Sequence, residues 1–182
     1  MHLEVETKAR IGNVSDLRNK IKKIAKYNNT KVKKDKYFAI NRNGYPEKAF
    51  RVRFDGKKYV VNFKRKLNGL CERDIVVKEE YEFVLKNREH LENFMSLLSD
   101  LKFKKWINKE KKSETYLYNK DKRAGIEVNN VKRLGYFLEI EYLCSRKEVM
   151  GAKKTIRNIL RELGIEWKDI DNTGYTKMLW IG

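Results

Sequence analysis

The dominant pattern along the chain is a strict alternation of polar and apolar residues, which is typical of half-buried β-strands. Residues 2–10 show it clearly, with Glu4, Glu6 and Lys8 on one face and Leu3 on the other. Alternation or strand-like composition recurs in eight later segments. We therefore expect further strands at residues 32–40, 48–55, 58–67, 73–86, 103–111, 114–120, 124–130 and 135–143.

Three segments instead repeat their apolar residues at the spacing of a helix. They span residues 14–27, 88–100 and 146–163. Gly164 follows the last of them and is expected to end it, and the tail 173–181 is expected to add one or two helical turns. Tight turns are expected at Asn43-Gly44 and Asp55-Gly56.

Eight or nine strands and three or four helices predict an α+β fold built around an antiparallel sheet or barrel. The length of 182 residues suits one domain, and no stretch has the composition of a linker, so residues 1–182 are expected to form a single domain. The chain lacks an apolar run long enough to cross a membrane. With two cysteines, Cys71 and Cys144, expected to be reduced, we predict a soluble, cytoplasmic protein.

The formal net charge is +18, and charged residues make up 37% of the chain. Such an excess favours anionic partners, and nucleic acid, an anionic membrane surface and small polyphosphates all qualify. The total charge alone does not choose among them.

The position of the charges on the strands narrows this choice. On a single strand, charges opposite an apolar face are most simply explained by solubility. Here many strands carry them, and a closed antiparallel barrel whose apolar face packs on helices would collect them in its interior. The acids so collected are Glu4, Glu6, Glu80, Glu82, Glu139 and Glu141, and the bases are Lys8, Arg10, Arg51, Arg53, Lys64, Lys78, Lys109 and Lys111.

This combination of charges points to a metal-bound polyphosphate. Clustered carboxylates repel one another unless a cation lies among them, and carboxylates without histidine or cysteine suit Mg²⁺ or Mn²⁺. Side chains two residues apart on a strand are about 6.6 Å apart, so two facing glutamate pairs can reach one or two metal ions. Clustered lysines and arginines equally require an anion, and arginine binds phosphate oxygens in bidentate fashion.

The segment from Glu4 to Lys8 resembles the ExExK signature of the CYTH domain, the triphosphate tunnel metalloenzymes. This superfamily includes class IV adenylate cyclases, thiamine triphosphatases and inorganic triphosphatases. Later segments resemble further motifs of the family in the same order, so the resemblance spans essentially the whole chain. They are Lys34-Asp35-Lys36-Tyr37-Phe38, Phe50-Arg51-Val52-Arg53, Asn62-Phe63-Lys64, Lys78-Glu79-Glu80-Tyr81-Glu82, Lys109-Glu110-Lys111, residues 134–141 and residues 174–179.

The resemblance implies an eight-stranded antiparallel tunnel with helices packed outside. It implies that Glu4, Glu6, Glu139 and Glu141 bind Mg²⁺ or Mn²⁺, with Glu80 and Glu82 close to the metal. It implies that the phosphates are held by Lys8, Arg51, Arg53, Lys64, Lys78, Lys109 and Lys111. Glu4, Glu6 and Lys8 are the residues to which we assign a catalytic role.

The chain also departs from the family pattern. The usual aspartate in the strand before the last glutamate pair is Asn129 here, and Lys78 and Lys111 replace arginines. Outside the motifs, the pair Lys33-Lys34 is expected to be solvated. Tyr37 and Tyr175 are expected to be packing residues, and Arg10 to lie inside or just outside the tunnel mouth.

Two reactions fit such a site. A hydrolase would remove the terminal phosphate, and a lyase of the adenylate cyclase type would convert ATP to cyclic AMP and pyrophosphate. The motif spacings resemble the cyclase branch, but a fold does not determine a substrate, so ATP, thiamine triphosphate and tripolyphosphate all remain candidates.

A rival hypothesis is a non-enzymatic protein that binds RNA or polyphosphate through its basic surface. The interleaving of acids with bases opposes specific binding of nucleic acid. We expect no membrane partner, and either a monomer or a homodimer.

Overall fold

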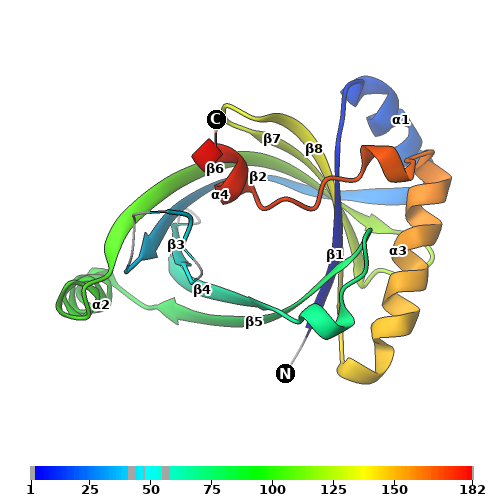
Figure 1. Cartoon of the computed structure of the whole chain (residues 1–182). Coiled ribbons are helices and arrows are strands. Elements are labelled where there is room, and N and C mark those ends of the chain that lie inside the picture. Colours follow the sequence, from blue (N-terminus) through cyan, green and yellow to red (C-terminus); the bar gives the residue numbers. More distant parts are fainter. Residues whose placement is uncertain (1–2, 41–43, 47, 55–57, 182) are drawn as a thin grey trace.

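Eight antiparallel strands form a closed barrel in the computed structural model, which describes residues 3–40, 44–46, 48–54 and 58–181 (Figure 1). Around the barrel the strands follow the order β1-β5-β4-β3-β2-β6-β7-β8. Their bounds are β1 Leu3–Arg10, β2 Ala25–Ala39, β3 Phe50–Phe54, β4 Tyr59–Lys66, β5 Val76–Leu85, β6 Lys104–Tyr118, β7 Ala124–Val131 and β8 Gly135–Cys144. The predicted fold class is confirmed.

Helices pack outside the barrel. Their bounds are α1 Val14–Ile24, α2 Arg88–Asp100, α3 Val149–Leu163 and α4 Tyr175–Ile181. The side chain of Asn13 caps α1 by accepting a hydrogen bond from the amide of Asp16. Gly164 ends α3 in the left-handed conformation, at φ 69°, as expected for a glycine in this position.

Several predicted elements were wrong in their extent, including the strand expected at 32–40, which begins at Ala25. The first helix ends at Ile24 rather than at residue 27, because Ala25 and Tyr27 already pair with β6 at the start of β2. The strands expected at 103–111 and 114–120 are one continuous strand, β6, which pairs with β2 on one side and β7 on the other. Hydrogen bonds along both edges let β6 continue through its polar middle. The turn expected at Asp55-Gly56, and Asn43 of the other turn, lie outside the described residues.

The main hydrophobic core lies between the outer face of the barrel and helices α1 and α3. Val5, Ile21, Ile140, Ile156 and Ile159 are fully buried in it. Figure 1 shows α3 running along the side of the barrel formed by β1 and β8. Each such side chain stabilises the fold by about 1.5–3 kcal/mol through burial.

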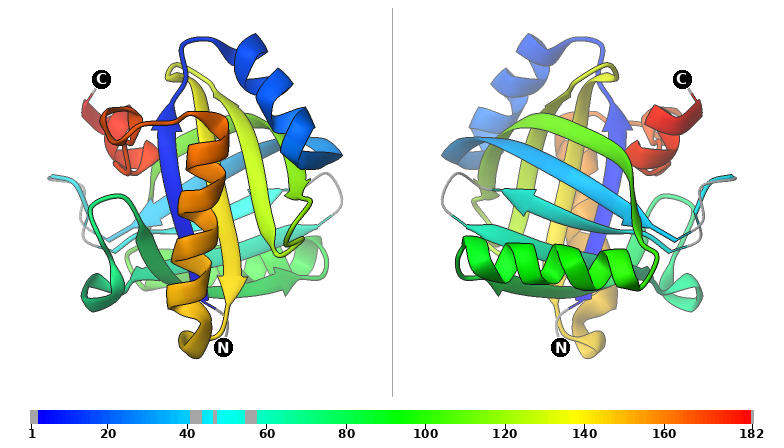
Figure 2. Two further views of the ribbon diagram at one scale, coloured as in Figure 1. Left: turned by 90° about the vertical axis from the view of Figure 1, so that its right-hand side faces the viewer. Right: turned by 90° about the vertical axis from the view of Figure 1, so that its left-hand side faces the viewer.

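A second core lies on the opposite side of the barrel, beneath α2 (Figure 2). Phe38, Val52 and Val61 are buried there together with Leu85 and Leu98. Because both cores lie outside the barrel and side chains alternate along a strand, the polar faces of the strands point into the barrel. Among the described residues, none of the helices is both long and apolar enough to cross a membrane.

Candidate functional site

A polar cavity of about 420 Å³ occupies the interior of the barrel. Charged side chains from strands β1, β2, β3, β4, β5, β6 and β8 line it, and residues 172–176 of the C-terminal segment cover one side. Apart from Arg10, every residue that the sequence predicted for the site reaches this lining, and Glu82 is among them. The residues expected to bind metal or phosphate are Glu4, Glu6, Lys8, Arg51, Arg53, Lys64, Lys78, Glu80, Lys109, Lys111, Glu139 and Glu141. Arg10 lies outside, where its half-exposed side chain pairs with Asp171.

Strands β1 and β8 bring the acidic side chains together. In their register, Glu6 lies opposite Glu141, and Lys8 lies opposite Glu139. Carboxylate oxygens of Glu4, Glu6 and Glu141 lie within 4.8 Å of one another. A set of oxygen donors this close suits a hard divalent cation such as Mg²⁺ or Mn²⁺.

The environment of these carboxylates drives their pKa values apart. Burial raises the pKa of Glu4 to about 9, and the neighbouring carboxyls of Glu6 and Glu141 add to the rise, although Lys64 opposes it. Burial also disfavours the charge on Glu6, but Lys78, a hydrogen bond with Glu4 and Lys64 together outweigh it and hold the pKa of Glu6 below its usual range. A divalent cation among these groups would favour the ionised form of all of them.

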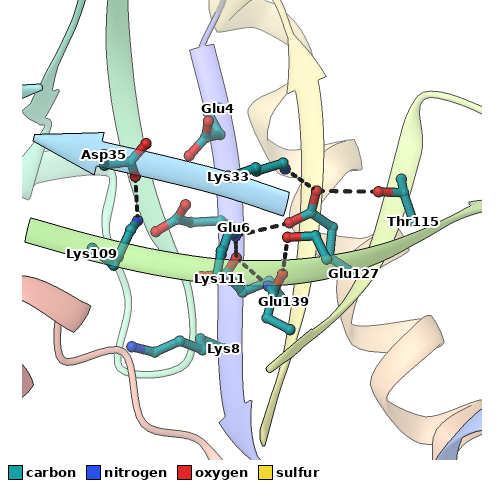
Figure 3. Close-up of polar contacts among 12 residues, drawn as sticks. Glu4, Glu6, Lys8, Lys33, Asp35, Lys109, Lys111, Thr115, Glu127 and Glu139 are labelled. Carbon is teal, nitrogen blue, oxygen red and sulfur yellow. Dashed lines mark hydrogen bonds and ion pairs between the residues drawn. The ribbon is translucent and has the colours of Figure 1, made fainter. Parts of the chain in front are cut away.

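Lysines of other strands donate directly to the glutamates of β1 and β8. The Nζ of Lys64 donates to Oε1 of Glu4 at 2.7 Å, and Lys78 donates to Glu6. Lys111 of β6 reaches across to β8, where its Nζ lies 2.7 Å from Oε2 of Glu139 (Figure 3). These charge-assisted hydrogen bonds hold the lysine ammonium groups at the centre of the cavity.

Asp35 of β2 organises the arginine side of the cavity. Its carboxylate accepts two hydrogen bonds from Arg53, at 2.6 and 3.1 Å, and lies 3.0 Å from Nζ of Lys109. Arg51 lies 3.6 Å away. Burial opposes the charge on Asp35, but these three cations outweigh it and hold its pKa well below its usual range.

Lys33 and Glu127 belong to the same network, although the sequence analysis assigned Lys33 to the solvated surface and gave Glu127 no role. The Nζ of Lys33 donates to Oε1 of Glu127 at 2.6 Å, and Lys111 donates to the other oxygen at 3.0 Å (Figure 3). The expectation for Lys33 was wrong because Lys33 and Asp35 lie two residues apart on β2 and so share the face that points into the barrel. Glu127 could have been predicted from the sequence, because it lies two residues before Asn129 on the same strand and therefore shares its face.

Tyr37 and Tyr175, which were expected to be packing residues, also line the cavity. The Nζ of Lys8 lies 4.2 Å from the ring centroid of Tyr175, close enough for a cation–π contact. Lys8 also donates to the carbonyl of Thr173, so the C-terminal segment is held against β1. Burial lowers the pKa of Lys8 to about 8, against the opposing effect of Glu139.

Asn129, where the family pattern has an acid, is completely buried. Its Nδ2 donates to Oε2 of Glu139 at 2.7 Å, and its Oδ1 accepts from Ser113 at 2.5 Å. The amide therefore offers Glu139 a hydrogen-bond donor, which a carboxylate at this position would not provide.

Comparison with known proteins supports the fold. No family model and no curated protein matches the sequence. A protein from Pyrococcus horikoshii has the same fold, with a TM-score of 0.77 and 28% identity over 96% of this chain and 98% of that chain. A proposed adenylate cyclase from Vibrio parahaemolyticus aligns with a TM-score of 0.75 and 14% identity, covering 98% of both chains.

A plant protein from Hippeastrum, described as a proposed adenylyl cyclase with dominant triphosphatase activity, also shares the fold. Its TM-score is 0.63 at 15% identity, over 96% of this chain and 91% of that chain. The architecture is therefore one that occurs in proposed adenylate cyclases and in a protein with triphosphatase activity.

Proposed function

We propose that this chain, which has the fold of the CYTH superfamily of triphosphate tunnel proteins, is an enzyme that binds a triphosphate with divalent metal ions inside its barrel. The observation that carries the proposal is the convergence of acidic and basic side chains on one interior cavity of about 420 Å³. Clustered carboxylates repel one another unless cations lie among them, and clustered lysines and arginines repel one another unless they bind a multiply charged anion. A triphosphate with bound metal ions would relieve both repulsions.

The metal ligands in this proposal are Glu4, Glu6 and Glu141, with Glu139 and Glu80 beside them. Their oxygen donors fit Mg²⁺ or Mn²⁺. A divalent ion held by these residues would supply charge stabilisation to the phosphates and would increase the acidity of a bound nucleophile.

The phosphate ligands are the basic residues of the lining. Arg51 and Arg53 offer planar donor groups that match phosphate oxygens, and Asp35 orients both of them. The lysines among the ligands are Lys8, Lys64, Lys78, Lys109 and Lys111. In the reaction these cations offset the negative charge that develops on the phosphate oxygens.

Two reactions use this arrangement. In hydrolysis, water attacks the terminal phosphorus of ATP, thiamine triphosphate or tripolyphosphate, the bond from this phosphorus to the bridging oxygen breaks, and orthophosphate and the remaining diphosphate are released. In cyclisation, the ribose 3′-hydroxyl of ATP attacks the α-phosphorus, and pyrophosphate leaves with formation of cyclic AMP. The names of the Vibrio and Hippeastrum proteins support both possibilities. We further propose that the chain is a single domain and is either a monomer or a homodimer. We also propose that it is located in the cytoplasm, and the free thiols of Cys71 and Cys144 support this location.

The reaction can be identified by incubating the protein with ATP, thiamine triphosphate or tripolyphosphate, each with Mg²⁺ or Mn²⁺, and analysing the products. Cyclic AMP would identify a cyclase, and orthophosphate a triphosphatase. No product from any substrate would contradict the enzymatic proposal and favour a binding protein.

The metal ligands can be tested with Glu6→Ala and Glu139→Ala. Each variant should abolish metal-dependent turnover of the triphosphate while the protein remains folded by circular dichroism. Glu79→Ala is the matched control, because Glu79 lies on β5 outside the cavity lining and pairs with the exposed Arg65. Unchanged activity in Glu6→Ala would remove this residue from the metal site.

The arginine side can be tested with Arg51→Ala, which should raise the Michaelis constant for the triphosphate because a bidentate phosphate ligand is lost. Arg65→Ala, on β4 outside the cavity, should leave this constant unchanged. An equal effect in the two variants would show that only the general charge of the protein matters.

A further inference from the structure

A second cavity, of about 610 Å³, lies outside the barrel. It runs between α2 and the outer faces of β2, β3 and β6, on the side of the molecule seen in the right-hand view of Figure 2. We call it the outer groove. Its volume falls in the range of about 300–1,000 Å³ that is usual for small-molecule sites.

The floor of the outer groove is apolar. It is formed by Phe38, Val52, Phe54, Tyr59, Leu91 and Met95. Phe38 and Val52 are buried under α2, whereas Phe54 is 43% exposed and its ring lies tilted against that of Tyr59, with the centroids 4.9 Å apart. An apolar ligand body covering this floor would remove exposed hydrophobic surface from water.

The rim of the outer groove is cationic. Lys34 and Lys36 project outward from β2, and Lys132 and Arg133 come from the turn between β7 and β8. All four are exposed, and none forms an ion pair with another residue in the described part of the chain. The turn is held beside β6 by a hydrogen bond from the amide of Lys132 to the carbonyl of Glu110.

Acidic side chains offset this charge only in part. Asp35 also borders the outer groove, but its carboxylate is turned into the barrel, where Arg53 and Lys109 bind it. Glu110 is the other carboxylate among the described lining residues. A net positive rim beside an apolar floor is complementary to a molecule with a negative head and an apolar body.

We propose that the outer groove binds a small amphipathic organic anion. The acyl or aromatic body of this ligand covers the floor, and its carboxylate or phosphate meets Lys34, Lys36 and Arg133. Lys109 borders both the outer groove and the interior cavity, but Lys34, Lys36 and Arg133 line only the groove. The proposal does not depend on the function proposed for the interior of the barrel.

Calorimetric titration with dodecanoate, below its micelle-forming concentration, provides the test. We expect one molecule to bind per chain, with dodecyl phosphate binding comparably. Dodecanol lacks the head charge and acetate lacks the body, so each should bind at least about tenfold more weakly. Equal affinity for dodecanol and dodecanoate, or no binding of dodecanoate, would overturn the proposal.

Two pairs of variants locate the ligand. The double variant Lys34→Glu, Lys36→Glu should weaken dodecanoate binding at least about tenfold. Lys22→Glu, Lys23→Glu changes the net charge equally but lies on α1, away from the groove, and should have no more than a twofold effect, roughly the scale of a general charge effect. An equal loss of dodecanoate affinity in the two double variants would show that only the net charge matters and would contradict a specific site in the outer groove.

The floor is tested by Phe54→Ser, which should also weaken binding, whereas Phe83→Ser should not. Phe83 is comparably exposed, at 51%, but lies on β5 outside the groove. Finally, Lys64→Ala should leave dodecanoate binding unchanged. A loss of binding in this variant would place the ligand inside the barrel and overturn the proposal.

Discussion

Asp35 illustrates how one buried side chain positions several others. It has a fully buried carboxylate, and Arg51, Arg53 and Lys109 surround it. Removing one member of such a buried ionic network leaves the remaining charges without a partner, which is costly in free energy. Asp35 is therefore expected to act as a positioning residue for the phosphate ligands.

Asp35→Asn should lower the free energy of unfolding at neutral pH by about 3–5 kcal/mol. A carboxyl group whose folded pKa is depressed contributes its full stabilisation above the unfolded pKa. This contribution decreases as the pH falls from the unfolded pKa towards the folded pKa. The difference between wild type and Asp35→Asn should therefore shrink as the pH falls below the ordinary value of 3.8. Urea unfolding at pH 7 and pH 3 measures it.

Asp16→Asn is the control for this experiment, because Asp16 forms an exposed ion pair with Lys20 on α1. Such surface pairs contribute about 0–1 kcal/mol. A loss at pH 7 no larger in Asp35→Asn than in Asp16→Asn would contradict the positioning role.

Asn129→Asp tests the amide that replaces the acid of the family pattern. The new carboxylate would face Glu139 and remove its hydrogen-bond donor, so thermal stability in EDTA should fall by about 1–3 kcal/mol. Mn²⁺ should restore more stability to this variant than it adds to wild type, because a cation relieves the repulsion. Thermal unfolding with EDTA and with Mn²⁺ measures both effects, and an equal response to Mn²⁺ in the exposed control Asn130→Asp would contradict the idea.

At the scale of elements, two glycines at helix α3 have opposite effects, Gly151 inside the helix and Gly164 directly after its last residue. Gly164 ends the helix at φ 69°, and a Cβ there would meet only the flexible end of Lys20 at 3.7 Å. Gly164→Ala should therefore destabilise by backbone strain alone, about 1–2 kcal/mol. Gly151→Ala, in open space within the helix, should stabilise by about 0.5–1 kcal/mol. Chemical denaturation distinguishes the two, and effects of the same sign would contradict the assigned helix end.

The elements also show which features local pattern could predict. The N-terminal strand, the helix after it and the paired glutamates of β8 were predicted because their periodicity is local. The extent of β2 and β6 was not, because Ala25–Ala39 and Lys104–Tyr118 carry many polar residues and pair with each other along most of their length. A pairing between distant segments leaves no signal in either segment alone.

At the scale of the whole molecule, the charge of +18 leaves the nucleic-acid hypothesis testable. If the basic surface binds RNA nonspecifically, affinity for polyuridine should fall steeply between 50 and 200 mM salt, values typical of such tests. Lys64→Ala should leave this binding unchanged, because Lys64 lies inside the barrel. Fluorescence anisotropy measures both, and salt-resistant binding that is lost in Lys64→Ala would contradict binding through the basic surface and place the RNA inside the barrel.

The sequence by itself determined which side chains share a face, and hence that acids and bases would collect inside a barrel. Only the tertiary structure decided which of them meet. Asp35 binds Arg53 and Lys109, and Lys111 binds Glu127, because the order of strands around the barrel and their register bring these positions together. Alternation is a property of each strand, whereas register is a property of a pair of strands, so the contacts of the site could not be read from the chain alone.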